Sequence, residues 1–360
     1  MIIGIDASRA GKLQKTGTEW YSYFLIEELK KLPTSHGFVL YSSEPLTGEL
    51  GQLPGNFENL VLAWPPSLLW TQARLSAAAF ARPPDRLFVP SHALPFFSRA
   101  KTVVTVHDVG FMRYPDMYSF LDLSYHRLSV SFASRFAHRI ICPSEFTKRE
   151  LITFFSTPPE KIRVVPHGAP QYDQPTAPNT SDVAVQPTVF FVGRLEKKKN
   201  ILGLLMALVL LRRTHPDLKL VLAGKPGFGF AEIKTFIENN GLRKTVEIKR
   251  YISEAEKILL YQRAVIFGFP SFYEGFGLPI LEAQFFGCPV LTSDFGATKE
   301  IAGLGAYLVD PKSPESIAEG LTTLLRDRSL RKKLILSGRE NLKRFSWTRT
   351  AQATLKVLEE

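Results

Sequence analysis

The chain has 360 residues, a length that predicts two domains rather than one core. Hydrophobic residues make up 45% of it, which excludes an intrinsically disordered protein. The longest apolar run, Ile201–Leu211, is shorter than the roughly 18 residues of a membrane-spanning helix. The formal net charge is +11, but no nucleic-acid-binding motif accompanies it, so nucleic acid is not an expected partner. A solvated surface, or a patch facing an anionic membrane or acceptor, accounts for the charge instead.

The start of the chain and its two cysteines bear on the compartment. Residues 1–6 form a strand-like run without the basic region and cleavage site of a secretory signal. Cys142 and Cys288 lie far apart in apolar stretches and show no metal-binding or redox spacing. We therefore expect a cytoplasmic protein with reduced thiols. Peripheral binding at the inner face of the membrane is a further reading that the charge leaves open.

From residue 1 to residue 168, short β-branched runs alternate with longer amphipathic stretches, which is typical of βαβ units and a parallel sheet. Strands are expected at residues 2–6, 38–41, 60–63, 86–89, 101–107, 139–142 and 162–165, and helices at residues 19–31 and 119–136. This segment is predicted to form one doubly wound, Rossmann-like domain.

Residues 169–187 have the composition of a linker, with four prolines among Asn, Thr, Ser and Asp. The alternation then begins again, with strands expected at 188–192, 219–223, 245–249, 265–270, 289–292 and 306–309. Helices are expected at 201–215, 231–239, 253–263 and 279–286, and two more close the chain. We predict a second Rossmann-like domain over residues 188–345 and a C-terminal helix over 346–360 that packs back on the first domain. Two such domains are expected to face each other across a cleft, because open α/β sheets bind ligands beyond the carboxyl ends of their strands.

The strongest functional signal is the segment 269–283, Phe-Pro-Ser-Phe-Tyr-Glu-Gly-Phe-Gly-Leu-Pro-Ile-Leu-Glu-Ala. This pattern indicates a strand end, a glycine-flanked loop and a helix that begins at Pro279. Gly275 and Gly277 let backbone amides approach a ligand, and the helix N-terminus favours an anion such as phosphate. Glu282 is expected in the first helical turn, where it either binds ligand hydroxyls or merely complements the helix dipole. Glu274, on the loop, is suited to a sugar hydroxyl.

A second signal follows the strand at 188–192, in the sequence Gly-Arg-Leu-Glu-Lys-Lys-Lys-Asn at residues 193–200. Cations at the entrance to a helix oppose its dipole, so the run is locally unfavourable unless an anion binds there. Arg194 can hold a phosphate by two-point contact, whereas a lysine acts as a point charge. Lys197 and Lys198 are expected to form only a solvated basic turn.

Two weaker signals lie in the first domain. His107 and Asp108 come at the carboxyl end of the strand at 101–107, a position that leaves a functional and a structural role equally open for the histidine. Thr16, Gly17 and Thr18 stand between the first strand and the first helix. A glycine turn there can touch a phosphate or an acceptor, although the sequence is not G-x-G-x-x-G.

Together these stretches resemble glycosyltransferase family 4, the retaining group with the GT-B fold, over nearly the whole chain. The resemblance is most specific in the Glu-x7-Glu element, here Glu274 and Glu282. It is equally specific in the Gly-Arg-Leu…Lys-Asn element, here Gly193, Arg194 and the pair Lys199-Asn200. Residues 106–115, Val-His-Asp-Val-Gly-Phe-Met-Arg-Tyr-Pro, are also similar to a stretch of bacterial mannosyltransferases in this family.

The resemblance implies a donor site. Arg194 and Lys199 would bind the donor diphosphate, Glu282 would hold the ribose hydroxyls, and Glu274 would contact the transferred sugar. The rest of the implied site is made of backbone groups along the two loops, at Gly193, Gly275, Phe276, Gly277 and Leu278. His107 would lie beside the anomeric centre or a far hydroxyl of the sugar. Gly17, Thr18 and Asp108 would belong to the loop near the acceptor or diphosphate, where Thr-Gly-Thr replaces the family's more glycine-rich turn.

The implied reaction moves a hexose, with mannose favoured, from a GDP- or UDP-hexose to a glycan or lipid-linked glycan. His107, Arg194, Lys199 and Glu274 would be the catalytic residues. Fixed cations and helix N-termini would stabilise the charge on the departing diphosphate, so neither a metal nor another cofactor is expected. The leaving phosphate itself would accept the acceptor's proton, with retention at the anomeric carbon. Two alternatives stay open: a nucleotide-sugar epimerase of the same architecture, and a non-catalytic nucleotide-sugar-binding protein.

Overall fold

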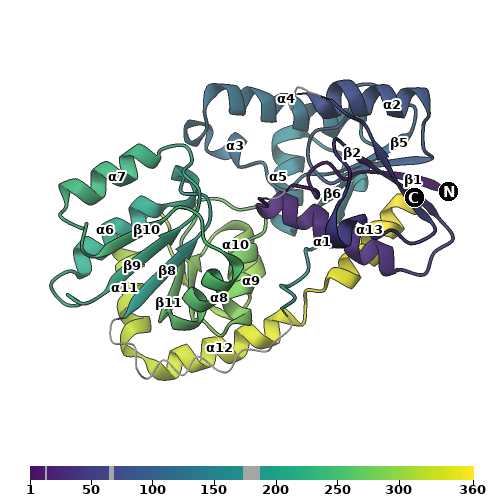
Figure 1. The fold of residues 1–360 in the computed structure, drawn as a ribbon. Coiled ribbons are helices and arrows are strands. Elements are labelled where there is room, and N and C mark those ends of the chain that lie inside the picture. The colour runs from purple at the N-terminus through teal and green to yellow at the C-terminus, as the bar shows by residue number, and fades with distance from the viewer. Residues whose placement is uncertain (13, 65–68, 173–186) are drawn as a thin grey trace. The chain divides into compact units, whose positions relative to one another are not determined.

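The computed structural model describes residues 1–12, 14–64, 69–172 and 187–360. The chain divides into two compact units, and each is built on its own parallel sheet (Figure 1). The first unit holds residues 1–113, 120–168 and 345–360, and the second holds residues 114–119 and 169–344. Of the linker expected at 169–187, residues 173–186 lie outside the described part of the chain.

The first unit contains a seven-stranded parallel sheet of order β3-β2-β1-β4-β5-β6-β7. Its strands are β1 Ile2–Asp6, β2 Gly37–Ser42, β3 Phe57–Val61, β4 Arg86–Val89, β5 Lys101–Thr105, β6 Arg139–Cys142 and β7 Ile162–Val164. Ile3, Ile5 and Val103 on the central strands are fully buried, as expected for a parallel sheet covered on both faces. The strand order reverses between β1 and β4, and ligands of such sheets bind at the carboxyl edge beside this reversal.

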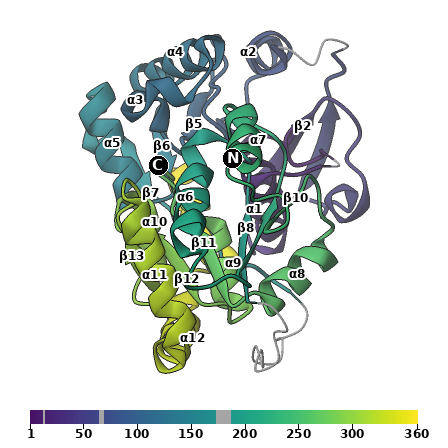
Figure 2. The ribbon, with the colours of Figure 1, turned by 90° about the vertical axis from the view of Figure 1, so that its left-hand side faces the viewer.

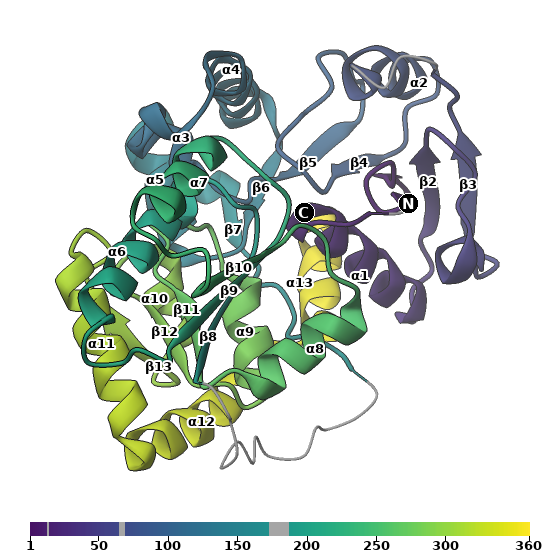
Figure 3. The same cartoon turned by 60° about the vertical axis from the view of Figure 1, so that its left-hand side comes forward.

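The helices of the first unit are α1 Gly17–Lys31, α2 Ser76–Ala81, α3 Gly110–Arg113, α4 Phe120–Phe136, α5 Glu145–Phe155 and α13 Trp347–Glu359. Helix α13 lies alongside α1 (Figure 3). Trp347 is 1% exposed there, and the hydroxyl of Thr350 donates to the carbonyl oxygen of Pro166 at 2.7 Å. The last helix of the chain is thus part of the first unit's core.

The second unit contains a six-stranded parallel sheet of order β10-β9-β8-β11-β12-β13. Its strands are β8 Thr188–Val192, β9 Lys219–Ala223, β10 Val246–Lys249, β11 Ile266–Phe269, β12 Val290–Ser293 and β13 Ala306–Val309. Its helices are α6 Ile201–Leu211, α7 Phe230–Asn239, α8 Glu254–Arg263, α9 Leu278–Phe285, α10 Gly296–Ala302, α11 Pro314–Arg326 and α12 Arg328–Leu342. The apolar helix α6 packs beside α11 (Figure 2), and no helix of the described residues is both long and apolar enough to span a bilayer.

Three expected elements differ most in the structure, and β5 also ends at Thr105, two residues before His107, rather than at residue 107. Strand β3 lies at 57–61 rather than 60–63, because Phe57 pairs with Phe38 of β2 and their rings stack at 4.3 Å. Helix α6 ends at Leu211 rather than at residue 215, in keeping with Pro216, which disfavours helical backbone in the residue before it. Three helices rather than two close the chain, since Asp327 ends α11 and its carboxylate caps α12 by accepting from the Leu330 N–H.

Candidate functional site

The loops that follow β8 and β9 in the second unit meet backbone to backbone. The N–H of Gly193 donates to the carbonyl oxygen of Ala223 at 3.0 Å, and Gly193 has a φ of +149°. A Cβ placed on Gly224 would lie 1.8 Å from the carbonyl oxygen of Gly193. Glycine is therefore required at position 224, where any side chain would push the two loops apart. This contact fixes the backbone that carries Arg194.

Arg194 is the exposed cation of this loop. Its side chain is 66% exposed, and its Nε lies 3.5 Å from the carboxylate of Glu196. A surface ion pair of this kind contributes little to stability. Arg194 is thus held at the carboxyl edge of the sheet with its guanidinium accessible to an anion.

The lysine run folds as a single 3₁₀ turn at Lys197–Lys199. The ammonium of Lys197 lies 2.7 Å from the carboxylate of Glu232. Lys198 is only 9% exposed, and its ammonium lies over the Tyr118 ring, 5.5 Å from the centroid. The expected solvated turn is therefore wrong for Lys198, because an aromatic side chain from residues 114–119 packs on it.

Asn200 joins three loops at the end of this turn. It adopts a left-handed φ of 54°, and its side-chain oxygen accepts from the N–H of Gly203 and so caps α6. Its amide nitrogen donates to the carbonyl oxygens of Pro270 at 3.0 Å and Pro311 at 2.6 Å. These buried bonds give Asn200 a structural role beside the predicted donor residues.

Lys199 and Glu274, two of the predicted catalytic residues, form an ion pair. The Lys199 ammonium lies 2.5 Å from Oε1 of Glu274, and 14% and 10% of the two side chains are exposed. The loop that carries Glu274 is tied at two further points. The N–H of Phe272 donates to the carbonyl oxygen of Lys198 at 3.0 Å. The hydroxyl of Ser293 donates to the carbonyl oxygen of Ser271 at 2.5 Å. The structure therefore brings the two main sequence motifs together.

Gly277 turns this loop into α9. Its φ of +114° favours glycine, and it occupies the N-cap position of the helix. Gly275 and the 5% exposed Phe276 precede it in the loop. The helix begins at Leu278 with Pro279 second, so Glu282 is the fifth helical residue. Its expected place in the first turn is therefore wrong by about one position, because helix formation begins one residue before the proline.

Glu282 is held by two side chains of α8. Its Oε1 lies 2.9 Å from the ammonium of Lys257, and its Oε2 accepts from the Tyr261 hydroxyl at 2.9 Å. Burial alone would lower the pKa of Lys257, but Glu282 and neighbouring groups raise it, so this lysine stays charged at neutral pH. Burial and the nearby Glu282 carboxylate raise the pKa of Tyr261. Neither partner belongs to a sequence motif, although their spacing of four residues on one helix face could have indicated them.

His107 lies at the carboxyl edge of the first unit's sheet. Its Nε2 is 3.1 Å from the carbonyl oxygen of Pro90, and this contact requires the proton on Nε2, because a carbonyl can only accept. The Tyr21 ring packs edge-on at 4.8 Å. Burial lowers the pKa of His107 to about 4, so the imidazole is neutral at neutral pH. Asp108 accepts from the Gly110 N–H at 3.0 Å and so ties the turn that leads to α3.

Gly17 and Thr18 open helix α1 nearby. Within the described part of the chain, no atom lies within 4 Å of a Cβ built on Gly17, so packing among these residues does not require glycine there. The carbonyl oxygen of Thr18 accepts from the Ser22 hydroxyl. Glu19, which the sequence analysis did not single out, is 7% exposed, accepts from the Thr16 N–H at 3.1 Å and pairs with Arg9 at 3.3 Å. An acidic residue in a first helical turn is so common that its sequence alone gives little signal.

A cavity of 260 Å³ lies elsewhere in the second unit, beside the start of α6. Its wall is mostly apolar and includes Ile201, Met206 and Phe272, together with Lys197 and Asn200. Arg194, Lys199, Glu274 and Glu282 are not among its lining residues. This cavity is therefore distinct from the predicted donor residues.

Comparison with known proteins identifies the relatives of this chain. Residues 178–341 match the family model described as Glycosyl transferases group 1, and residues 16–171 match Glycosyltransferase Family 4. The chain is 28% identical over 265 residues to O-antigen chain mannosyltransferase B of Escherichia coli, covering 71% of this chain and 70% of that protein. It is 31% identical over 219 residues to D-inositol 3-phosphate glycosyltransferase of Corynebacterium glutamicum, covering 56% of this chain and about half, 52%, of that relative.

Two solved structures share the fold over nearly the whole chain. Sucrose-phosphate synthase of Thermosynechococcus elongatus matches with a TM-score of 0.80 and 20% identity, covering 99% of this chain and 98% of that one. Anabaena HepE in complex with UDP and glucose matches with a TM-score of 0.74 and 22% identity, covering 100% and 99%. These matches confirm the predicted GT-B fold. With family models matching both halves of its sequence, the chain belongs to glycosyltransferase family 4, the retaining enzymes that transfer a sugar from a nucleotide sugar.

Proposed function

We propose that this chain transfers mannose from GDP-mannose to a glycan or lipid-linked glycan acceptor. The similarity of residues 106–115 to bacterial mannosyltransferases supports mannose, and so does the relationship to an Escherichia coli protein named as a mannosyltransferase. A UDP-hexose is the second candidate donor, because the HepE structures hold UDP with glucose, or UDP-glucose.

The buried Lys199–Glu274 pair is the observation that carries the donor assignment. It stands at the loop before α9, where a helix N-terminus favours an anion. We assign the diphosphate to Arg194 and Lys199 and the transferred sugar to Glu274. Backbone groups of Gly193, Gly275, Phe276, Gly277 and Leu278 complete this proposed site.

We assign the ribose to Glu282. Among the described residues, each of its carboxylate oxygens has one partner, Lys257 for Oε1 and Tyr261 for Oε2. A carboxylate offers about four acceptor positions, so two remain for the hydroxyls of a ribose diol. The two partners also fix the orientation of the carboxylate, and a fixed acceptor loses less conformational entropy when a ligand binds.

The proposed chemistry stabilises the departing nucleoside diphosphate. Breaking the anomeric C–O bond places negative charge on its phosphate, and Arg194, Lys199 and the α9 N-terminus supply fixed positive potential for that charge. The departing phosphate then accepts the proton of the acceptor hydroxyl as the new C–O bond forms on the same face. His107, neutral at neutral pH, is proposed to contact the sugar, and Gly17, Thr18 and Asp108 the acceptor or diphosphate. We propose that no metal is required, so chelation with EDTA should leave the rate unchanged.

Thermal unfolding against a panel of nucleotides and their sugar conjugates tests the donor. A ligand at about 100 times its Kd stabilises the fold by about 2.7 kcal/mol. We expect GDP and GDP-mannose to raise the melting temperature of the wild type, and to raise that of Arg194→Ala much less at the same ligand concentration. Stabilisation by the UDP series alone would show that the donor base is uracil rather than guanine. The absence of any stabilisation would contradict the donor site.

The reaction itself separates transfer from epimerisation. We expect mannosyl transfer only when an acceptor glycan is present. Conversion of GDP-mannose to an isomeric nucleotide sugar without any acceptor would instead establish the epimerase alternative. Full activity of a Glu274→Ala variant in every assay would favour the non-catalytic alternative.

A further inference from the structure

Helix α4 exposes apolar side chains along one face. Leu121, Tyr125, Leu128, Phe132 and Phe136 follow one another at spacings of four and three residues, which place them on one stripe of the helix. Leu121 is 77% exposed, Leu128 61% and Phe136 58%. Val130 and Ala133 of the same helix are buried, so the core of the unit already has its own contact with α4. Single exposed apolar residues are common, but a continuous stripe indicates an interaction surface.

The stripe continues beyond α4. The Phe132 ring contacts Phe96 edge-on at 5.0 Å, and Phe96 and Phe97 are 43% and 69% exposed. The hydroxyl of Ser76 donates to the carbonyl oxygen of Phe97 at 2.8 Å, which ties this loop to α2 and its 45% exposed Phe80. Figures 1 and 3 draw α2 and α4 along the same side of the first unit. We call this surface the aromatic face, and its members are Phe80, Phe96, Phe97, Leu121, Tyr125, Leu128, Phe132 and Phe136.

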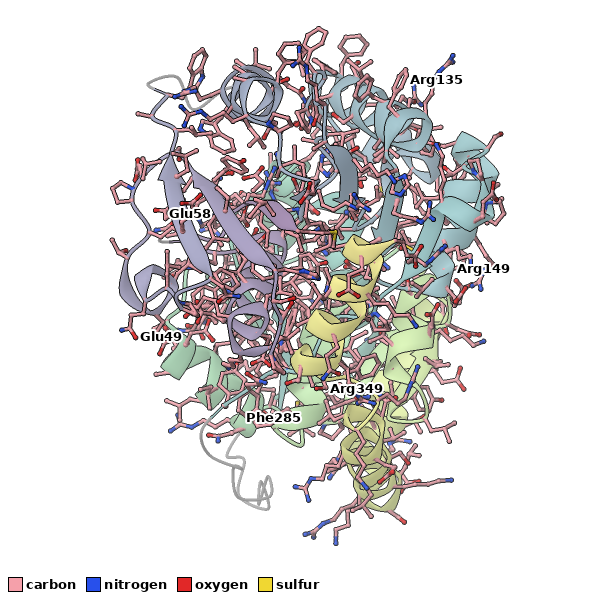
Figure 4. The ribbon with its side chains drawn as sticks, turned by 90° about the vertical axis from the view of Figure 1, so that its right-hand side faces the viewer. Glu49, Glu58, Arg135, Arg149, Phe285 and Arg349 are labelled. Carbon is pink, nitrogen blue, oxygen red and sulfur yellow. The ribbon has the colours of Figure 1, made fainter. Side chains whose placement is uncertain are left out.

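Positive charge accompanies the aromatic face. The guanidinium of Arg99 lies over the Phe80 ring, 4.1 Å from its centroid, and that of Arg135 lies 5.6 Å from the centroid of Phe136. Figure 4 shows the Arg135 side chain pointing outward from α4. A hollow of 660 Å³, lined by Phe96, Phe132, Phe136, Lys101 and Lys161 among others, lies at the end of the stripe. The segments 76–82, 94–101 and 120–136 contain five Arg or Lys residues and one acidic residue, Asp122.

We propose that the aromatic face binds the surface of an anionic lipid bilayer. Aromatic and leucine side chains would enter the boundary between headgroups and acyl chains, while Arg99 and Arg135 would lie at the level of the lipid phosphates. This arrangement places α4 in the plane of the membrane surface rather than across it. The inference does not depend on which sugar is transferred or on the donor residues.

Charge argues against the second candidate occupant, another copy of this chain. A two-fold interface through the aromatic face would place the same patch of each copy on the other. Arg99 and Arg135 of both copies would then share one interface, and like charges brought together in this way are costly. An anionic bilayer instead complements these arginines along the whole face.

Sedimentation of the full chain with vesicles tests the proposal. We expect binding to vesicles that contain phosphatidylglycerol, weaker binding at high salt and little binding to pure phosphatidylcholine. The variant Leu121→Ser/Leu128→Ser/Phe136→Ser should bind anionic vesicles about tenfold more weakly or worse, because it removes three large apolar groups from the membrane boundary. The matched control Leu210→Ser/Leu304→Ser/Leu336→Ser removes three side chains of the second unit that are 52%, 86% and 65% exposed, and it should bind as the wild type does.

A second pair of variants tests the charge separately. Arg99→Gln/Arg135→Gln should bind anionic vesicles about tenfold more weakly, whereas Lys332→Gln/Lys333→Gln, with the same change in net charge on α12, should not. Far-UV circular dichroism and the melting temperature without ligand check that each variant is folded. Equal losses for test and control pairs would overturn the proposal, and so would a wild type that ignores anionic vesicles. If analytical ultracentrifugation shows a dimer that Leu121→Ser/Leu128→Ser/Phe136→Ser abolishes, the aromatic face binds a second copy of this chain rather than a bilayer, and the proposal is overturned.

Discussion

The ammonium of Lys199 lies 2.5 Å from the carboxylate of Glu274, and water is nearly excluded from both side chains. The positive charge predicted to meet the donor diphosphate is therefore already compensated within the second unit. A bound diphosphate has to share Lys199 with Glu274, whereas Arg194 meets solvent with 66% of its side chain exposed. Removal of Lys199 should therefore destabilise the fold, whereas removal of Arg194 should not.

Lys199→Ala should lower the free energy of unfolding by about 3 kcal/mol, because it leaves the Glu274 carboxylate buried without its counter-ion. Urea denaturation followed by circular dichroism measures this loss. The double variant Lys199→Met/Glu274→Leu should recover most of the stability while abolishing transfer. Lys197→Ala, which removes a more exposed lysine 2.7 Å from Glu232, should cost less than about 1 kcal/mol. Equal costs for the two single lysine variants would contradict the burial argument.

Arg194→Ala should leave stability unchanged and weaken donor binding. A hydrogen bond to a charged group contributes about 1.5–3 kcal/mol, so the Kd for GDP should rise by about 10- to 100-fold. Isothermal titration calorimetry measures this directly. Arg243→Ala removes an arginine that is 76% exposed and paired with Glu238, and it serves as the control with unchanged affinity. An unchanged Kd in Arg194→Ala would remove this residue from the phosphate site.

Glu282→Gln should weaken GDP binding by about tenfold, since a neutral amide accepts ribose hydroxyls less strongly than a carboxylate. The same substitution should have little effect on 2′,3′-dideoxy-GDP, which lacks those hydroxyls. Glu254→Gln is a matched control, because Glu254 also pairs with Lys257, at 3.0 Å, and is 52% exposed. If Glu282→Gln weakens both ligands equally, the carboxylate acts through the loop structure rather than on the ribose.

Acidification should destabilise the protein partly through His107. Burial lowers its pKa to about 4 from a usual value of 6.5. Between these values the unfolded chain binds a proton that the folded chain does not, so the free energy of unfolding falls as the pH drops through this window. His107→Gln should make stability less dependent on pH there. The dependence should not vanish, since burial also lowers the pKa of His92, to about 3. Identical pH profiles for variant and wild type would contradict this origin.

Gly224→Ala should displace the loop that carries Gly193 and Arg194, although residue 224 is not itself proposed to contact the donor. Its Cβ would lie 1.8 Å from the carbonyl oxygen of Gly193 at a φ of +146°, so we expect a loss of about 3 kcal/mol in stability and weaker GDP binding. Gly241→Ala separates the two causes, because Gly241 has a φ of +65° but no atom of the described residues within 4 Å of a built Cβ. It should cost about 1 kcal/mol and leave GDP binding intact. Similar losses for the two variants would show that backbone strain alone is responsible.

The sequence by itself determined the fold class and the family of this protein. Strands can be located by local signals, namely runs of apolar residues and the glycine-containing loops that separate strands from helices. The strands β1, β4, β6, β8, β9 and β13 accordingly lie at the predicted residues. The start of β3 at Phe57 could not be predicted in this way, because it is set by pairing with Phe38 of β2, which is distant in sequence. The sequence motifs also named Lys199, Glu274 and Glu282 as separate groups.

Only the tertiary structure decided which groups meet and which face solvent. Lys199 and Glu274 are 75 positions apart, and Lys257 and Tyr261 reach Glu282 from a helix that carries no motif. The stripe from Leu121 to Phe136 has the period of a core-facing helix, yet the fold turns it outward. Periodicity records which residues share a face of a helix. Whether that face is buried depends on the segments that pack against it, and those are fixed by contacts between distant parts of the chain.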